Sequence, residues 1–480
     1  MKDIRRWHRA ENDSEKPVYC IGDVAGTGKS TIAVTMAEEW SKEQCFSFFF
    51  STDSAHKART LCISLAKQVI ASCYGQNWDE YWAKLPSDLS SPISQNVENL
   101  WEKLVAQPFG ICGVHKRHVL VVDALDECEK GTQVQLLKCL LGACTSKSQP
   151  EIRLLLTTRK EEDIIREMAA FHDAIVLRSL RDSEASRADI TRYVNYRLGV
   201  GEVIELGTEQ RKQLIDRCNG LFMFASLACD LLKKACADDL PRLLQDILDK
   251  FTSLDTLYLQ TLSQVGNSLD YTRARLMDIL RVILVARESF SITDIAALLS
   301  MKVNSVEKIV KQLGSILSSG AIDQPVYILH ATLKEFLLRE RLKIEEKMEL
   351  KTGGKEIENE YYISQAEAER AVLKGCLSNV MAHGLIFNIC SLETSFLTNE
   401  EVIDMDNRIN RCITSALHYS CLNWTSHLAA VGYDDEILRW LEEFMNNRFL
   451  SWLEVLSVTE RVRFAPGMLT VLIEWMRVSP

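Results

Sequence analysis

The chain has 480 residues, 47% of them hydrophobic, and a formal net charge of −10. This length suits about three domains, and the acidic balance argues against nucleic acid as a partner, because nucleic-acid-binding domains usually carry a basic face. Fifteen cysteines without closely spaced pairs favour reduced thiols. Since no signal-like start and no run of ~20 apolar residues occurs, we expect a soluble, cytoplasmic protein without a membrane span.

The first predicted elements surround a glycine-rich segment. A charged lead-in contains at most one short helix near Ile4 and Trp7. The apolar run Val18–Ile21 predicts a buried strand, and Thr31–Trp40 has apolar residues at helical spacing. A strand, a glycine-rich turn and a helix in this order are typical of a phosphate-binding loop.

The residues of this loop suit a nucleotide. Its glycines let backbone N–H groups curve around phosphate oxygens, and the start of the helix favours anions. Lys29 would reach the β- and γ-phosphates, and the Ser30 hydroxyl would ligate Mg²⁺. We therefore expect a nucleoside triphosphate or diphosphate to bind at Ala25, Gly26, Thr27, Gly28, Lys29, Ser30 and Thr31.

One position departs from the usual loop. A glycine is expected six residues before the lysine, but Asp23 occupies that position and follows Gly22. Either the loop has an extra residue, or a carboxylate lies near the phosphates. Because such a carboxylate would weaken phosphate binding, we expect a shifted turn with Asp23 facing solvent. The departure also keeps open a scaffold that holds nucleotide without hydrolysing it.

Two further strands end in charged residues. The apolar run His118–Asp123 predicts a buried parallel strand whose terminal aspartate would hold Mg²⁺ through water beside Ser30. Asp126 or Glu127 would orient or deprotonate the attacking water. A strand that merely ends in a polar loop explains one of these acids but not all three.

Another predicted strand, Ile152–Thr158, ends at Arg159. Strand ends on this side of an open α/β sheet face the ligand crevice, so Arg159 could sense the γ-phosphate. The alternative is a solvated loop arginine.

The remaining elements complete a multidomain α/β plus α fold. Residues 271–341 predict three helices, a short β-pair and a helix, which is the order of a winged helix. A transcriptional regulator is the less favoured alternative, because the third of these helices has few basic residues. The predicted domains are a lead-in (1–17), a P-loop NTPase domain with a doubly wound parallel sheet (18–180), a helical domain (181–270), a winged-helix domain (271–341), a charged linker, flexible or helical (342–361), and a C-terminal all-α region (362–480).

Three motifs carry a family resemblance. AGTGKST (25–31), VVDALDE (121–127) and LLLTTRK (154–160) resemble the NACHT class of signal-transduction ATPases with numerous domains, abbreviated STAND. The chain is similar to the fungal set related to heterokaryon-incompatibility proteins, whose N-terminal part is nephrocystin-3-like. Softer matches continue to about residue 460. We expect neither an N-terminal effector domain nor a repeat array in this chain.

The resemblance implies a switch driven by ATP and ADP, or by GTP and GDP, with Mg²⁺. The diphosphate would hold a closed state, the triphosphate would favour self-oligomerisation and protein partners, and slow hydrolysis would reset the switch. It also implies that His330 contacts the diphosphate, although this histidine could instead cap the helix that follows it. Fungal non-self recognition or regulated cell death would be the biological role.

Overall fold

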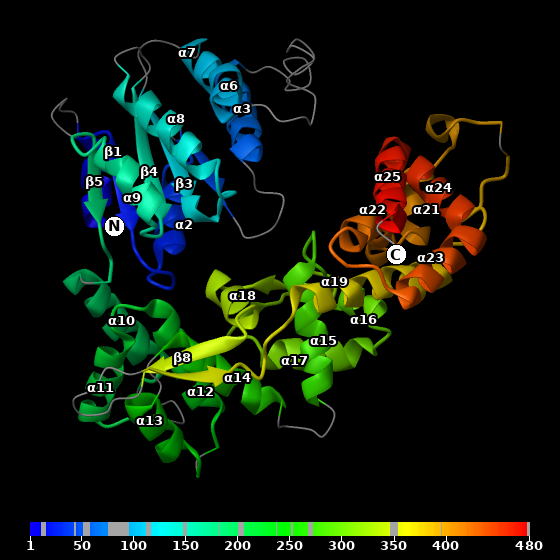
Figure 1. Ribbon diagram of the computed structural model, residues 1–480. Coiled ribbons are helices and arrows are strands. Elements are labelled where there is room, and N and C mark those ends of the chain that lie inside the picture. The colour runs from blue at the N-terminus through cyan, green and yellow to red at the C-terminus, as the bar shows by residue number, and fades with distance from the viewer. Residues whose placement is uncertain are drawn as a thin grey trace. The chain divides into compact units, whose positions relative to one another are not determined.

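The computed structural model forms two compact units, Met1–Lys233 and Lys234–Pro480 (Figure 1). The residues that the structure describes are 1–10, 16–42, 45–50, 58–74, 96–111, 117–146, 151–181, 183–199, 206–236, 238–250, 253–266, 272–345, 354–394 and 396–477. Among these residues, no helix combines the length and the apolar character that crossing a membrane requires.

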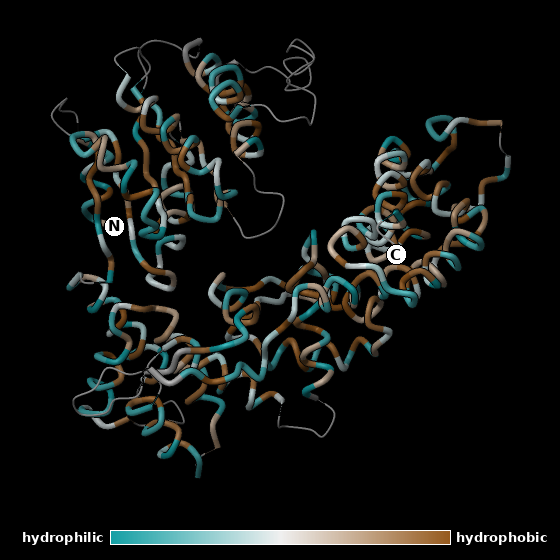
Figure 2. Tube along the Cα trace, viewed as in Figure 1, coloured by the Kyte–Doolittle hydropathy of each residue, from teal (hydrophilic) through white to brown (hydrophobic). Residues whose placement is uncertain are grey.

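The first unit is built around a five-stranded sheet in the order β2-β3-β4-β1-β5, with parallel pairing throughout. The central strands β1, β3 and β4 are buried along their whole length, as expected for a parallel sheet that is covered on both faces. Figure 2 shows the hydrophobic character of the central strands. The strands are β1 (Val18–Gly22), β2 (Cys45–Phe49), β3 (His118–Asp123), β4 (Ile152–Thr158) and β5 (Ile175–Arg178).

Alternate residues of the strands face two separate cores. Tyr19 and Ile21 pack with α1 (Lys2–Arg9) and α2 (Lys29–Glu39), while Val18 and Cys20 face the opposite layer. The predicted doubly wound sheet is therefore confirmed. The opposite layer contains α3 (Ala58–Tyr74), α6 (Val97–Trp101), the π-helical segment η1 (Glu102–Ala106), α7 (Gln107–Ile111), α8 (Gln133–Thr145) and α9 (Glu162–Ala169).

A buried arginine fastens α1 to the sheet. Arg153 lies on β4 with only 2% of its surface exposed. Its guanidinium donates to the carbonyl oxygens of Trp7 and Ala10 (2.8 Å for Ala10) and stands 5.6 Å from the centre of the Trp7 ring. These carbonyls belong to the end of α1, where a helix has no internal donors left. The short lead-in helix is thus held by tertiary contacts.

Replacing Arg153 by Met should therefore loosen α1. Hydrogen bonds to a charged group contribute about 1.5–3 kcal/mol, so we expect the melting temperature of the first unit to fall by about 3–12 °C. Thermal unfolding followed by circular dichroism measures this shift. Arg166→Met, on α9 with a largely exposed side chain, is the control and should change little. Equal shifts in both variants would contradict the anchoring role of Arg153.

Three helices follow the sheet, namely α10 (Glu184–Arg197), α11 (Thr208–Cys218) and α12 (Phe222–Lys234). Asn219 and Gly220 end α11 with positive φ angles of 45° and 76°. The pair suits the end of a helix, since Asn and Gly tolerate the left-handed region best.

The second unit begins with helices and a small β-pair in the order predicted for residues 271–341. Its assignment as a winged helix stays a prediction, as do the finer domain boundaries. The elements are α13 (Leu240–Asp249), α14 (Leu254–Gly266), α15 (Thr272–Val285), α16 (Ile292–Leu298), α17 (Val303–Gln312), β6 (Leu317–Ser318), β7 (Tyr327–Ile328) and α18 (Ala331–Leu337).

The charged segment after α18 differs from the expectation of a flexible or helical linker. It forms an antiparallel hairpin of β8 (Arg341–Glu345) and β9 (Gly354–Glu358). Arg341 lies opposite Glu358, and Leu342 lies opposite Ile357 with Leu342 fully buried. A pair of opposite charges is therefore followed by a pair of apolar residues, and cross-strand pairs of both kinds stabilise strands.

The C-terminal region is helical, as predicted, and its core contains the buried indoles of Trp424 and Trp452. The α/β plus α fold class is thereby confirmed. The helical elements are α19 (Gln365–Lys374), η3 (Gly375–Met381), α20 (Ala382–Gly384), η4 (Asn399–Glu401), α21 (Met405–Cys412), α22 (Ser415–Leu428), α23 (Asp435–Asn447), α24 (Phe449–Val458), η5 (Val462–Phe464) and α25 (Ala465–Arg477).

Candidate functional site

Three predicted motifs meet at one edge of the sheet. Strand β4 pairs with β1 on one side and with β3 on the other, all in parallel. The loop after β1, Asp123 at the end of β3 and Arg159 after β4 therefore lie side by side at the carboxyl ends of the strands. Ligands of open α/β sheets bind at this edge.

The loop between β1 and α2 has the backbone of a phosphate cradle. Gly26 and Gly28 have φ angles of 85° and 93°, which side chains rarely allow, and α2 begins at Lys29. The buried Thr27 braces the loop from inside, since its hydroxyl donates to the carbonyl of Val24 at 3.2 Å. The predicted glycines are thus required by the turn itself.

Lys29 lies within the loop. Its Nζ donates to the carbonyl oxygens of Asp23 and Val24, both at 2.8 Å. Burial lowers the pKa of Lys29, and the nearby carboxylates, Asp126 first, oppose that shift. The predicted lysine and acids therefore share one electrostatic environment.

The Thr157 hydroxyl orients the Asp123 carboxylate. Only 3% of the surface of Asp123 is exposed, and its carboxylate accepts a hydrogen bond from Thr157. Burial raises the pKa of Asp123, while the hydroxyl groups of Thr157 and Ser30 and the charge of Lys29 oppose the rise. The two residues predicted to hold Mg²⁺ therefore lie near each other.

Thr157 is a site residue that the sequence reasoning missed. It lies fully buried near the end of β4, and its hydroxyl also accepts the backbone N–H of Ala124 at 2.9 Å. Ala124 has a positive φ of 54°, an uncommon conformation for alanine. Thr157 therefore fixes both the Asp123 carboxylate and the turn after it. The sequence feature that could have indicated this role is a threonine near the end of β4, at the position that lies beside Asp123 when β3 and β4 pair in parallel.

The other predicted catalytic residues follow this turn. Asp126 lies in the 3₁₀ turn η2 (Leu125–Glu127), and its carboxylate accepts the Arg159 backbone N–H at 2.8 Å and pairs with the Arg159 side chain at 3.0 Å. Both of its oxygens therefore contact Arg159. Glu127 closes the turn and is half-buried.

Asp23 does not face solvent, so that expectation was wrong. Only 2% of its surface is exposed. Burial alone would raise the pKa of Asp23, but hydrogen bonds from the Arg181 backbone, Ser179 and neighbouring N–H groups lower it below its ordinary value. The physical reason is that the loop presents donors to this carboxylate, which compensate for its lost hydration.

His330 belongs to the second unit, where it caps α18. Its Nδ1 accepts the Thr332 backbone N–H at 3.2 Å and lies 2.6 Å from the Thr332 hydroxyl, which also contacts the Tyr258 hydroxyl at 2.8 Å. The capping alternative is therefore observed. The contact with a diphosphate stays a prediction.

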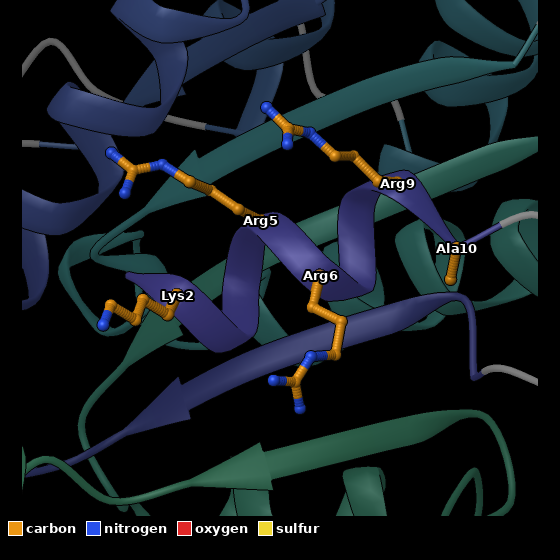
Figure 3. A pocket seen from close by; sticks show the side chains of 5 residues that line it. All are labelled: Lys2, Arg5, Arg6, Arg9 and Ala10. Carbon is orange, nitrogen blue, oxygen red and sulfur yellow. The ribbon is translucent and has the colours of Figure 1, made fainter.

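An open pocket of about 530 Å³ lies against α1 (Figure 3). It adjoins the C-terminal end of α2, where Arg5 pairs with Glu39. The phosphate loop is at the other end of this 11-residue helix, about 16 Å away at 1.5 Å per residue. In Figure 3, Lys2 and Arg6 extend to one side of α1, while Arg5 and Arg9 extend to the other. These cations therefore do not converge on one point. Because of the length of α2, the pocket is separate from the candidate site.

One protein family matches the N-terminal part of the chain. Residues 1–159 match the model described as Nephrocystin 3, N-terminal, which confirms the resemblance for this part. No curated protein matches the chain in sequence.

Several solved structures are similar to this chain. A STAND protein with a tetratricopeptide repeat sensor from Pyrococcus horikoshii is 10% identical, with a TM-score of 0.43, over 96% of this chain and 56% of its own. A Walker-type ATPase from Pyrococcus abyssi is 12% identical, with a TM-score of 0.34, over 70% and 94%. The ORC1 protein of Aeropyrum pernix, solved in complex with DNA, is 14% identical, with a TM-score of 0.33, over 69% and 88%. The chain thus spans 56% of the length of the P. horikoshii protein.

The position of Thr157 generates a prediction. Thr157→Val keeps the shape of the side chain but removes the hydroxyl that orients Asp123. Because losing a partner of a metal ligand typically costs 10–100-fold, we expect Mg²⁺-dependent nucleotide affinity to fall about that much, with affinity in EDTA little changed. Titration of a fluorescent ADP analogue with and without Mg²⁺ measures both. The exposed Thr145→Val is the control, and equal losses in Mg²⁺ and EDTA would rule out the orienting role.

Proposed function

We propose that residues 1–159, which match the Nephrocystin 3, N-terminal family, form a P-loop NTPase domain of the NACHT type, and that the chain is a nucleotide-operated signalling switch. It binds ATP and ADP, or GTP and GDP, at the loop after β1. The observation that carries this proposal is the meeting of Lys29, Asp123 and Arg159 at the carboxyl edge of one parallel sheet.

The residues fit Mg²⁺ bound with the nucleotide. Mg²⁺ prefers oxygen ligands and is typically held by one or two carboxylates together with substrate phosphates. Ser30 and Asp123 offer a hydroxyl and a carboxylate beside the phosphate loop, and the Ser30 hydroxyl is near enough to favour the ionised form of Asp123. When bound there, Mg²⁺ would neutralise charge on the phosphate oxygens.

The acids of η2 divide into two roles. Arg159 holds Asp126, so this aspartate positions the arginine at the edge where a γ-phosphate would lie. We propose Glu127, the last residue of the same turn, as the acid that orients the attacking water. Slow hydrolysis through Glu127 would return the switch to its diphosphate state.

The switch itself requires different affinities for two states. We propose that the diphosphate favours a closed state to which His330 contributes a phosphate contact, and that the triphosphate favours self-oligomerisation and binding of protein partners. A role in fungal non-self recognition or regulated cell death follows from the family resemblance alone.

A scaffold that binds nucleotide without hydrolysing it is the second candidate function. The observation that favours it is the pairing of Asp126 with Arg159, which engages both oxygens of one of the two predicted catalytic acids. Turnover distinguishes this candidate from the switch.

Lys29→Ala tests the nucleotide site. The change removes the ammonium that would contact the β- and γ-phosphates, so we expect nucleotide affinity to fall at least 100-fold, a loss of about 2.7 kcal/mol. Equilibrium titration of fluorescent ATP and ADP analogues measures it. Lys138→Ala, an exposed lysine of α8, should bind as the wild type does. Equal affinities in all three proteins would refute the site.

Glu127→Gln separates hydrolysis from binding. The amide keeps the size of the side chain but cannot accept a proton, so we expect the hydrolysis rate to fall about 10²–10⁴-fold with nucleotide affinity largely kept. Single-turnover assays with radiolabelled ATP and GTP measure the rate. The exposed Glu129→Gln is the matched control. If the wild type hydrolyses nucleotide no faster than Glu127→Gln, the scaffold is supported over the switch.

A further inference from the structure

Asp23 lies between the ends of two strands that flank β1. Its backbone N–H donates to the Thr158 carbonyl of β4 at 3.2 Å. Its side chain reaches in the other direction, to the segment that leaves β5 and leads to α10. The residue that departs from the usual phosphate loop therefore joins this loop to both neighbours of β1.

The Asp23 carboxylate accepts four hydrogen bonds. Oδ1 accepts the Val24 N–H at 2.8 Å, within the loop itself. Oδ2 accepts the Ser179 hydroxyl at 2.8 Å and the backbone N–H groups of Leu180 and Arg181 at 2.7 and 2.8 Å. Three donors of one short segment thus converge on one oxygen. An ionised carboxylate satisfies this geometry, whereas glycine offers no acceptor and an amide has only one oxygen.

The same segment is pressed against the end of α11. A Cβ at Gly220 would lie 2.4 Å from the Arg181 carbonyl oxygen, closer than atoms approach, and Gly220 has a φ of 76°. Only glycine therefore fits there. The Arg181 side chain also donates to the Asn219 carbonyl at 3.3 Å. Residues 179–181 are thus held between Asp23 and the turn that starts α12.

The first turn of α12 returns to the phosphate loop. The Met223 N–H donates to the Gly26 carbonyl at 3.1 Å. A Cβ at Gly28 would lie 3.7 Å from the Phe222 ring, in ordinary van der Waals contact. Contacts therefore connect the phosphate loop to residues 179–181, these residues to the turn before α12, and the start of α12 back to the loop. Asp23 provides the charged group in this set of contacts.

From these contacts we propose that Asp23 is a positioning residue that couples nucleotide occupancy of the phosphate loop to the helices α10–α12. The proposal rests on the nucleotide site proposed above and adds the path by which that site acts on its neighbours. Phosphate binding orders the loop backbone, and Asp23 transmits this order to residues 179–181 and on to the start of α12.

The carboxylate has a second consequence for the site. It lies close enough to Lys29 to oppose the lowering of that lysine's pKa by burial. Its four donors offset much of its charge, which allows a carboxylate to remain in a loop that binds phosphates. The departure from glycine at this position thus has a structural use that the loop pattern alone does not indicate.

Hydrogen exchange read by NMR or mass spectrometry on the full chain tests the coupling. In the nucleotide-free protein, Asp23→Asn should speed exchange of the Leu180 and Arg181 backbone amides at least tenfold. The asparagine side chain is uncharged, and its NH₂ group takes the place of one of the two carboxylate oxygens that accept hydrogen bonds. Adding ADP with Mg²⁺ should slow exchange at Met223 in the wild type. Asp23→Asn should still bind ADP, but this response at Met223 should be lost.

Asp173→Asn is the matched control, because this exposed aspartate lies just before β5 and makes no contact with the loop in the described structure. Ser179→Ala removes one hydrogen-bond donor and leaves the Asp23 carboxylate, so the exchange rates at Leu180 and Arg181 should increase less than in Asp23→Asn. This variant replaces Asp23→Asn in the test if Asp23→Asn fails to fold. Asp23→Gly restores the usual loop glycine and should bind ADP while also losing the response at Met223.

The outcomes separate the two proposals. Wild-type exchange at Leu180 and Arg181 in Asp23→Asn, or an unchanged ADP response at Met223 in that variant, overturns the coupling and leaves the nucleotide site standing. A wild type that binds ADP no better than Lys29→Ala overturns the nucleotide site and the coupling with it. A lost response in Asp23→Asn and Asp23→Gly, with ADP still bound, supports the coupling.

Discussion

The parallel pairing of β4 with both β1 and β3 is the constraint on which the candidate site depends. Since all three strands run in the same direction, their carboxyl ends meet at one edge. The residues that follow the strands therefore lie close together, although they are far apart along the chain. The pairing also places Thr157 level with Asp123, so one hydroxyl orients the acid and the turn after it. Two apolar cores, one on each face, keep these strands in register.

The charges at this edge balance in pairs. Arg159 neutralises Asp126, Lys29 lies among the acids, and backbone and hydroxyl donors compensate Asp23. Buried charges are tolerated only when they are paired or hydrogen-bonded in this way. Incoming phosphates would add negative charge to a balanced cluster, so their binding would favour new partners for Lys29 and Arg159. This provides an electrostatic basis for a site whose surroundings respond to the nucleotide.

The contacts of the loop extend beyond the phosphates. Asp23 reaches the exit of β5, Gly220 admits the Arg181 backbone, and Met223 bonds to Gly26. Short hydrogen bonds thus link the first βα loop to the helices after the sheet. In the second unit, His330 caps the N-terminus of α18. This contact gives the histidine a structural role, in addition to any contact with a nucleotide.

The sequence by itself determined the strands of the sheet, the phosphate loop, the acids after β3 and the order of the helices, because long apolar runs and glycine-rich turns are local patterns. It was misleading for Arg341–Glu345 and Gly354–Glu358, which form an antiparallel hairpin and not the expected flexible or helical linker. Only the tertiary structure decided the environments of Asp23 and Thr157. Asp123 lies 34 residues before Thr157, and Ser179, Leu180 and Arg181 lie 156 or more residues after Asp23, so these contacts leave no mark in the local sequence.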